Sequence, residues 1–408
     1  DNGRYVPAID AARPLNFADW SHLQQMADRE GQRLLSIPTL GEILRAHGKR
    51  MASAGSGSPG TTYLTNPTLT GPVANWALAW PAEVEAEIER RCGPLLGPDS
   101  TAADRTRYVL RAVQDYLVPG HRPDVLTLWL TEPDHAQHAH GIGSPEALST
   151  LAELDGQLEQ LVSALDAASA PNTYLLLSDH GFSTIAERPD INARLVAAGL
   201  KPTPEDRSIL YDCDSFYLNG AGPDRFDDLV RFLAGEPWVG ALLLRDDRMD
   251  GYPNAMPQSA VFGNHYRSAE LMFAYRWSVD ENAFGVPGCS ASYSSIAATH
   301  GSASPYDVNS SLVAWGAGIK QGILSAVPCG NVDVAPTVLR LLGLPAAPSM
   351  QGRVLTELLE GGPDPAEIEI GSVAREAVYQ SDKGPRRQTA HYSEVGEFRY
   401  LDQITWEE

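Results

Sequence analysis

Two strand-like segments of this chain each end abruptly in an aspartate and a histidine. The first is LTLWLTEPDHAQHAHG at residues 126–141, and the second is TYLLLSDHG at residues 173–181. Carboxylate oxygen and imidazole nitrogen are ligands that transition metals bind in proteins. In open α/β sheets, binding sites form in the crevice beyond the carboxyl ends of the strands. The two segments therefore predict an α/β fold that carries a metal site at strand ends.

The spacing within each segment allows its polar side chains to share one ion. Asp134 and His138 are four residues apart, so both side chains lie on one face of a helical turn. Asp179 and His180 are adjacent, and on a regular strand they would point to opposite faces. They can converge where the strand turns into a loop, and Gly181 permits that turn. All four side chains are candidate metal ligands.

A third element, ATHGS at residues 298–302, supplies His300 immediately before another glycine. Each fragment alone is compatible with solvated loop residues, but the three together predict a shared metal centre. His135 and His140 crowd the first segment and are expected to face solvent or to surround the ligands, because one helical turn cannot aim four side chains at one ion. His265, in FGNHYRS, is a candidate for substrate contact, although a structural histidine is the simpler interpretation.

The order of the predicted elements indicates a large α/β core with an insertion. A buried strand at 124–130, an amphipathic helix at 144–165 and a strand at 174–177 form a βαβ pattern, which is typical of parallel sheets. Residues 200–290 contain short strands and a helix at 224–234, and they separate the second ligand segment from the third. The expected division is core at 1–199 and 291–356, cap-like insertion at 200–290, and peripheral C-terminal segment at 357–408.

Charge and composition narrow the possible partners. The net charge of −21 argues against binding of nucleic-acid duplexes, which needs clustered lysine and arginine. An anionic small molecule remains compatible, because bound cations dominate their local field. No apolar run of about 18 residues occurs, so no membrane span is predicted, and a soluble chain could be cytoplasmic or exported. The cysteines are expected to be ordinary thiols, with one disulfide as the alternative: Cys92, Cys213, Cys289 and Cys329.

The fragments TEPDHAQHAHG, SDHG and THG, in that order, resemble the motifs of the type I phosphodiesterase/nucleotide pyrophosphatase branch of the alkaline phosphatase superfamily. The segments IPTLGEILRAHGKR and GNVDVAPTVLRLLGLP, followed by MQGRVL, also resemble that branch, so the resemblance extends over roughly residues 1–356. It implies an alkaline-phosphatase-like α/β fold with a central, mostly parallel sheet flanked by helices. It also implies two zinc ions and a small phosphate ester or nucleotide as substrate.

The resemblance assigns the candidate ligands to two ions. Asp134, His138 and His300 match the ligands of one zinc, and Asp179 and His180 match two ligands of the other. Manganese or iron could also occupy such mixed carboxylate and imidazole sites.

The family pattern also contains an aspartate at the end of its first strand and a Thr or Ser nucleophile at a helix start. Neither can be identified here, and residues 1–5 resemble the segment just after the nucleophile, so the chain is expected to start downstream of it. Ser56, Ser58 and Thr61 lie in a Gly-rich loop and are alternative nucleophiles, although that loop matches a different part of the family pattern.

The resemblance favours hydrolysis of phosphodiester or nucleotide pyrophosphate bonds. The alternatives are a phosphomonoesterase or phosphonate hydrolase of the same superfamily, or a non-catalytic metal-binding remnant of such an enzyme. A sulfatase is disfavoured, because no cysteine lies in a CxPxR context. Four aromatic residues could stack on a nucleotide base, although packing explains each more simply: Tyr266, Tyr275, Trp277 and Tyr306.

Overall fold

The computed structural model describes residues 3–407, except positions 5, 7–8, 11–13, 30, 32, 170 and 220–222. Asp1, Asn2 and Tyr5, which belong to the stretch predicted to follow the nucleophile region, therefore lie outside the described residues. The first described strands are β1 (Gly3–Arg4) and β2 (Leu15–Asn16), which pair with each other in antiparallel orientation.

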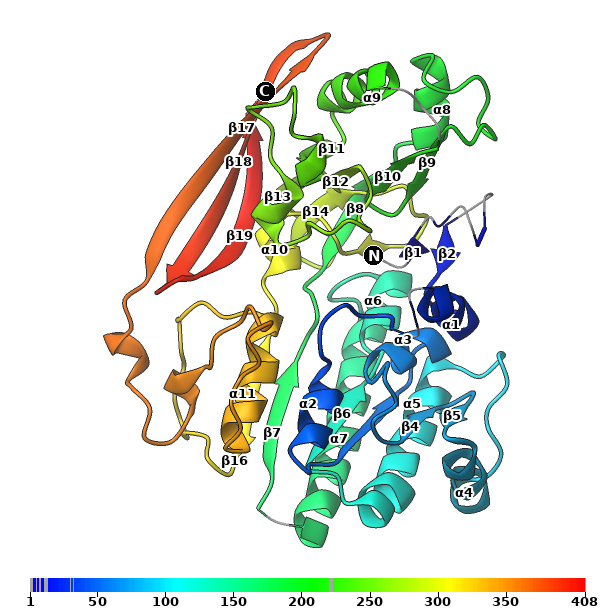
Figure 1. Ribbon diagram of the computed structural model, residues 1–408, viewed down its shortest axis with the longest axis vertical. Helices are drawn as coiled ribbons and strands as arrows, with labels where there is room; N and C mark the ends of the chain where they lie inside the picture. The colour runs from blue at the N-terminus through cyan, green and yellow to red at the C-terminus, as the bar shows by residue number, and fades with distance from the viewer. Residues whose placement is uncertain are drawn as a thin grey trace.

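The lower half of the molecule is a helix-covered sheet with strand order β5–β4–β3–β6 (Figure 1). Its central strand β3 runs parallel to both of its neighbours, β4 and β6. The strands are β3 (Met51–Gly55), β4 (Val73–Asn75), β5 (Ala79–Trp80) and β6 (Val125–Trp129). The covering helices are α4 (Ala82–Cys92), α5 (Ala102–Ala112), its π-helical continuation Val113–His121, and α7 (Pro145–Ser169). Ile88, Leu117 and Leu161 are buried in the core between these layers.

Shorter helices surround this sheet. They are α1 (Trp20–Arg29), α2 (Leu40–Ala46) and α3 (Pro59–Leu64). Thr39 caps α2 in a complete capping box with Glu42. The Gly-rich segment of Ser56, Ser58 and Thr61, expected to be a loop, contains the start of α3, because Ser58 supplies an N-cap and Pro59 suits the first helical turn.

Strand β7 (Thr173–Leu177) follows α7 and pairs in antiparallel orientation with β16 (Leu312–Gly316). The predicted order of β6, α7 and β7 is therefore present, but β6 and β7 belong to different sheets. Within the described residues, one edge of each strand has no strand partner. The residues of β6 are partly exposed, and Trp129 is 43% exposed, so the expectation of a buried strand is wrong. An apolar run indicates that a strand is suited to burial, but it does not reveal which elements cover the strand.

The upper half contains two further four-stranded sheets (Figure 1). One has the order β13–β14–β8–β15, and the other has the order β11–β12–β10–β9. The strands are β8 (Ser183–Glu187), β9 (Ile209–Asp212), β10 (Ser215–Leu218), β11 (Val239–Leu244), β12 (Leu271–Tyr275), β13 (Trp277–Glu281), β14 (Pro287–Ala291) and β15 (Ala298–Thr299). With α8 (Ile191–Ala197) and α9 (Pro223–Ala234) they enclose a core around Phe216, Trp238 and Phe273. The division at residues 200 and 290 stays a prediction.

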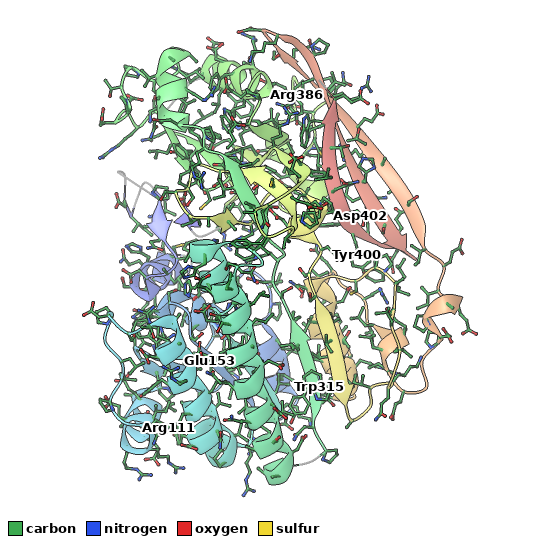
Figure 2. All side chains as sticks on the ribbon, turned by 180° about the vertical axis from the view of Figure 1, so that it is seen from behind. Arg111, Glu153, Trp315, Arg386, Tyr400 and Asp402 are labelled. Atoms are coloured by element: carbon green, nitrogen blue, oxygen red, sulfur yellow. The ribbon has the colours of Figure 1, made fainter. Side chains whose placement is uncertain are left out.

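The last part of the chain returns to the lower half and then forms a long antiparallel sheet. Helix α10 (Pro305–Val308) precedes β16 in the chain, and α11 (Val334–Leu341) follows it. Short 3₁₀ turns in this part are Asn331–Asp333, Thr356–Leu358 and Pro365–Glu367. Two more 3₁₀ turns, Asp246–Arg248 and Gln258–Val261, lie earlier, between β11 and β12. Strands β17 (Gly371–Ser381), β18 (Gly384–Val395) and β19 (Phe398–Glu407) follow. In Figure 2, Tyr400 and Asp402 mark β19 at the level where the two halves meet.

The C-terminal sheet docks onto the upper half through a glutamine that acts like a second peptide group. Strand β11 has an irregular register between Val239 and Ala241. The buried amide of Gln388 accepts a hydrogen bond from the backbone N–H of Leu242 at 2.9 Å and donates one to its carbonyl at 2.8 Å. The side chain thereby satisfies the buried N–H of Leu242, and it shares the carbonyl of Leu242 with the hydroxyl of Tyr379, which donates at 2.7 Å.

Two further features concern cysteines and membranes. All four cysteines are free thiols, which agrees with the expectation of ordinary thiols. In the part of the chain that the structure describes, no helix combines the length and the apolar character that a bilayer crossing requires.

Replacing Gln388 by alanine is expected to lower the free energy of unfolding by about 1–3 kcal/mol, because the buried N–H of Leu242 loses its partner. The carbonyl of Leu242 keeps the hydrogen bond that the hydroxyl of Tyr379 donates at 2.7 Å. Urea denaturation followed by circular dichroism measures the change. Gln380→Ala is the matched control, because Gln380 is an exposed glutamine of the same sheet. Equal stability of the two variants would contradict this account of the docking.

Candidate metal centre

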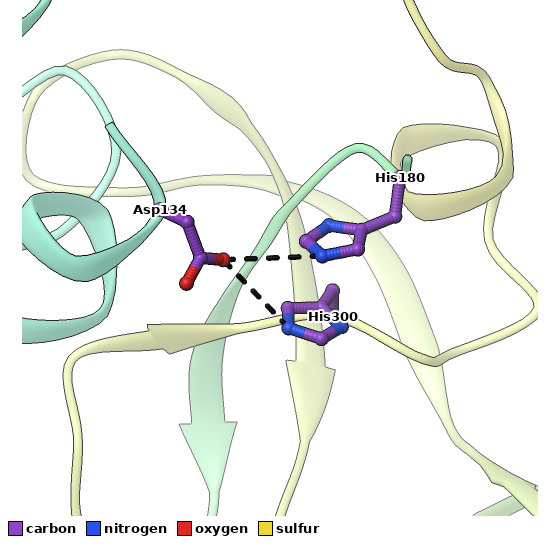
Figure 3. Close-up of side chains that lie close together, drawn as sticks. All are labelled: Asp134, His180 and His300. Carbon is purple, nitrogen blue, oxygen red and sulfur yellow. Dashed lines mark ion pairs between the residues drawn. The ribbon is translucent and has the colours of Figure 1, made fainter. Parts of the chain in front are cut away.

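The three ligand-bearing segments meet at the junction of the two halves. Asp134 begins α6 (Asp134–His140) just after β6, His180 follows β7, and His300 follows β15. Figure 3 shows the side chains of Asp134, His180 and His300 converging from these separate elements. The carboxylate oxygen Oδ1 of Asp134 lies 3.4 Å from Nε2 of His138, 3.8 Å from Nε2 of His300 and 3.9 Å from Nε2 of His180. Three imidazole nitrogens therefore surround one carboxylate oxygen.

Hydrogen bonds to the backbone orient two of these rings. Nδ1 of His138 lies 2.8 Å from the carbonyl oxygen of Ala298, and Nδ1 of His180 lies 2.8 Å from that of Gly181. A ring that donates its Nδ1–H to a carbonyl keeps its lone pair on Nε2. In both rings Nε2 faces Asp134. Histidines that bind a metal commonly have this arrangement, with one ring nitrogen bound to a backbone carbonyl and the other free to bind the ion.

The rings also pack against one another. His180 and His300 are stacked, with their centroids 3.5 Å apart and their planes inclined by 18°. The ring of Phe182 lies edge-on to His138 at 4.9 Å. Sequence reasoning missed Phe182, although its position directly after SDHG was the available signal. Burial, reinforced by the neighbouring imidazoles of His180 and His138, lowers the pKa of His300 to about 3, so this ring is neutral at pH 7.

Oδ1 of Asp134 is buried and has no hydrogen-bond partner. Burial raises the pKa of this carboxyl group, and the nearby imidazoles of His138 and His180 oppose that rise. A buried acceptor without a donor is costly, and a cation between the carboxylate and the imidazoles would satisfy it.

The donor set fits a transition metal in both chemistry and spacing. Ligand atoms of a tetrahedral zinc, each about 2.0–2.1 Å from the ion, lie roughly 3.3 Å from one another. The ligand atoms of Asp134, His180 and His300 all lie within 4.8 Å of one another. Among the residues that the structure describes, no other trio of histidine, cysteine or acidic side chains meets that criterion.

Asp179 joins the cluster through His180. Its Oδ2 lies 3.4 Å from Nε2 of His180, and its side chain is 50% exposed. The side-chain amide of Asn331 donates to the backbone carbonyl of Asp179 at 3.1 Å and fixes the end of the strand. The five predicted ligands are thus brought together, whereas their division between two ions stays a prediction.

The other histidine candidates lie apart from this arrangement or at its surface. His135 and His140 are exposed on α6, which agrees with the expected solvent-facing positions. His265 lies in the loop before β12, where its Nδ1 accepts a hydrogen bond from the backbone N–H of Arg267 at 3.2 Å. Its ring packs against Tyr266 at 4.3 Å. A substrate contact by His265 stays a prediction.

The alternative nucleophiles each take part in local structure. Ser56 is fully buried, and its Oγ accepts a hydrogen bond from the backbone N–H of Thr131 at 3.0 Å. Ser58 caps α3 by accepting from the N–H of Thr61 at 3.2 Å. The hydroxyl of Thr61 donates to the carbonyl of Ser58 at 3.0 Å. These contacts explain why the loop contains three hydroxyl side chains.

Packing also accounts for most of the aromatic candidates. Tyr275 is buried in the upper core, and the indole N–H of Trp277 donates to the carbonyl of Ile404 at 2.9 Å. The ring of Tyr306 lies 6.5 Å from that of Trp277. Tyr266 is the exception, because its side chain is 67% exposed.

Solved structures with a similar fold include two of murine ectonucleotide pyrophosphatase/phosphodiesterase 5. The first is 14% identical to this chain, covers 85% of it and 79% of the murine chain, and gives a TM-score of 0.54. The second, an inactive variant in complex with AMP, is 15% identical, covers 88% and 82%, and gives a TM-score of 0.56. These similarities confirm the predicted alkaline-phosphatase-like α/β fold.

Two curated relatives have detectable sequence similarity. Alkaline phosphatase PhoD from Zymomonas mobilis is 26% identical over 259 residues, which cover 55% of this chain and 43% of the relative. Alkaline phosphatase PafA from Elizabethkingia meningoseptica is 27% identical over 266 residues, which cover 58% and 46%. The chain thus spans less than half the length of these relatives.

The strongest assignment comes from a family model. The model described as type I phosphodiesterase / nucleotide pyrophosphatase matches residues 14–231, which are more than half of the 408 residues. The match includes Asp134, His138, Asp179 and His180 and excludes His300, which the fold brings beside them. The chain therefore belongs to the type I phosphodiesterase/nucleotide pyrophosphatase family of the alkaline phosphatase superfamily.

Proposed function

We propose that this chain is a metal-dependent hydrolase of phosphodiester or nucleotide pyrophosphate bonds that holds two zinc ions. The observation that carries the proposal is the buried Oδ1 of Asp134, which has no hydrogen-bond partner and on which three imidazole nitrogens converge. Membership of the family supports the reaction class. The AMP complex of the murine structural neighbour supports a nucleotide as substrate.

Asp134, His138 and His300 would hold one ion, and Asp179 and His180 would contribute to the other. When bound, such a metal pair activates a hydroxyl nucleophile and stabilises the negative charge that develops on the transferred phosphoryl group. The chain's own residues keep the donors ready, because His138 and His180 present Nε2 and His300 is neutral. The metal charge would also offset the net charge of −21 and allow an anionic substrate to approach.

A phosphomonoesterase is the second candidate, since both curated relatives are named alkaline phosphatases. Diester and monoester hydrolysis use the same metal chemistry, so the ligands do not separate the two activities. The ratio of activities toward a diester and a monoester separates them directly.

Zinc is expected to stabilise the wild-type chain and to lose most of that effect in Asp134→Ala. A ligand that binds only the folded state adds about 2.7 kcal/mol at a free concentration of 100 times Kd, which raises Tm by several degrees. The test is a thermal melt with and without Zn²⁺ after removal of metal by a chelator, together with the metal content of the purified chain. Asp99→Ala is the control, because Asp99 is exposed. An equal zinc response in Asp134→Ala would contradict the proposed centre.

Hydrolysis of bis-p-nitrophenyl phosphate is expected to exceed hydrolysis of p-nitrophenyl phosphate in kcat/KM. His138→Ala is expected to lower the diesterase kcat/KM by about 100-fold or more, because it removes a proposed metal ligand. Loss of a residue that only orients a ligand typically costs about 10- to 100-fold, so loss of the ligand itself should cost at least as much. His140→Ala is the matched control, since His140 is exposed on the same helix. Faster monoester hydrolysis would favour the phosphomonoesterase. Zinc binding without hydrolysis of either ester would favour the metal-binding remnant.

A further inference from the structure

The geometry of the metal centre depends on two loops that are distant in sequence. His180 and His300 are 120 positions apart, yet their rings stack with centroids 3.5 Å apart. A stack of this kind persists only if the two backbones are held at a fixed separation. The elements that join the two loops therefore decide whether the imidazole nitrogens can share one ion.

The carboxylate of Asp307 contacts both loops at once. Its Oδ1 accepts a hydrogen bond from the hydroxyl of Ser183 at 2.5 Å. Its Oδ2 accepts one from the backbone N–H of Ser302 at 2.7 Å. Ser183 is the third residue after His180, and Ser302 is the second after His300. One side chain thus links the segments that follow the two histidines.

The backbone of α10 holds the first of these loops as well. The N–H of Gly181 donates to the carbonyl of Asp307 at 2.7 Å, and the N–H of Phe182 donates to that of Tyr306 at 3.0 Å. A Cβ atom at Gly181 would lie 1.9 Å from the carbonyl oxygen of Tyr306, so this approach requires glycine. The loop of His180 is therefore seated directly on α10.

The carboxylate is itself fixed in place. The residue Asp307 is 3% exposed. Its backbone N–H donates to the hydroxyl of Ser304 at 3.1 Å, and the N–H of Ser304 lies 3.3 Å from the hydroxyl of Ser302. Burial raises the pKa of the Asp307 carboxyl group, and the bonds from Ser183, Ser302 and Ser304 oppose that rise.

We propose that Asp307 is a positioning residue that clamps the loop of His180 to the loop of His300 and thereby sets the affinity of the metal centre. This inference rests on the proposed metal centre, and it adds a residue outside the ligand set. Asp307 acts through its two accepted hydrogen bonds. Its charge is not required, so an amide that can make the same two contacts preserves the clamp.

The test compares Asp307→Ala with Asp307→Asn in zinc affinity and in the absorption spectrum of the Co²⁺-loaded chain. Zinc affinity is measured by competition with a chromophoric chelator at a temperature at which every variant is folded. Asp307→Ala is expected to weaken zinc binding 10- to 100-fold, the usual effect of losing a ligand support, and to change the Co²⁺ spectrum.

Asp307→Asn is expected to stay within about 3-fold of wild type. Its amide oxygen can accept from the N–H of Ser302, while its amide nitrogen donates to the hydroxyl of Ser183, which can rotate to accept. Ser183→Ala removes only one contact and is expected to weaken binding by about 3- to 10-fold. It provides the answer if Asp307→Ala does not fold.

Lys201→Ala is the control for a purely structural loss. Lys201 is 4% exposed in the upper half, where its Nζ donates to the side chain of Asn192 and to the carbonyl of Pro204. This variant is expected to melt earlier and to bind zinc like wild type.

Two results would overturn the clamp while wild type binds zinc. One is wild-type affinity and spectrum in folded Asp307→Ala, or in Ser183→Ala if the first variant is unfolded. The other is an Asp307→Asn variant as weak as Asp307→Ala, which would show that charge rather than hydrogen bonding matters. A wild-type chain that binds no zinc would instead remove the metal centre itself, and the clamp with it.

Discussion

The organisation of this molecule depends on one buried carboxylate oxygen, Oδ1 of Asp134. This oxygen has no hydrogen-bond partner, although three imidazole nitrogens lie 3.4–3.9 Å from it, and a buried acceptor without a donor is costly. A cation between these donors would satisfy this oxygen. The fold therefore has to bring together residues from three separate strand ends. It also has to hold these polar side chains close to one another before any ion binds.

Backbone carbonyls and a second aspartate, none of which belongs to the proposed ligand set, hold the histidine rings and their loops in position. The carbonyls of Ala298 and Gly181 select the nitrogen that faces inward on two of the rings. Asp307 then sets the separation of the loops, with both oxygens occupied. Such preorganisation would raise the affinity for a metal ion, because less conformational entropy would be lost on binding.

The sequence predicts the elements and the side chains that meet at the junction, because both follow from local patterns. Strand ends followed by Asp and His identified the side chains that meet. Tertiary cover is not local: α7 carries a regular leucine stripe, yet Leu148 is 57% exposed. Gln388 was not predicted either, because a side chain that replaces a peptide group leaves no periodic signal.

The C-terminal sheet contacts residues next to the loops that carry His300 and Asp179. The N–H of Ile404 on β19 donates to the carbonyl of Ala303, three residues after His300. Tyr400 on the same strand donates to Asp333 at 2.9 Å, and the turn of Asp333 includes Asn331, which holds the carbonyl of Asp179. Packing energy far from the metal centre therefore helps to hold its donors in place.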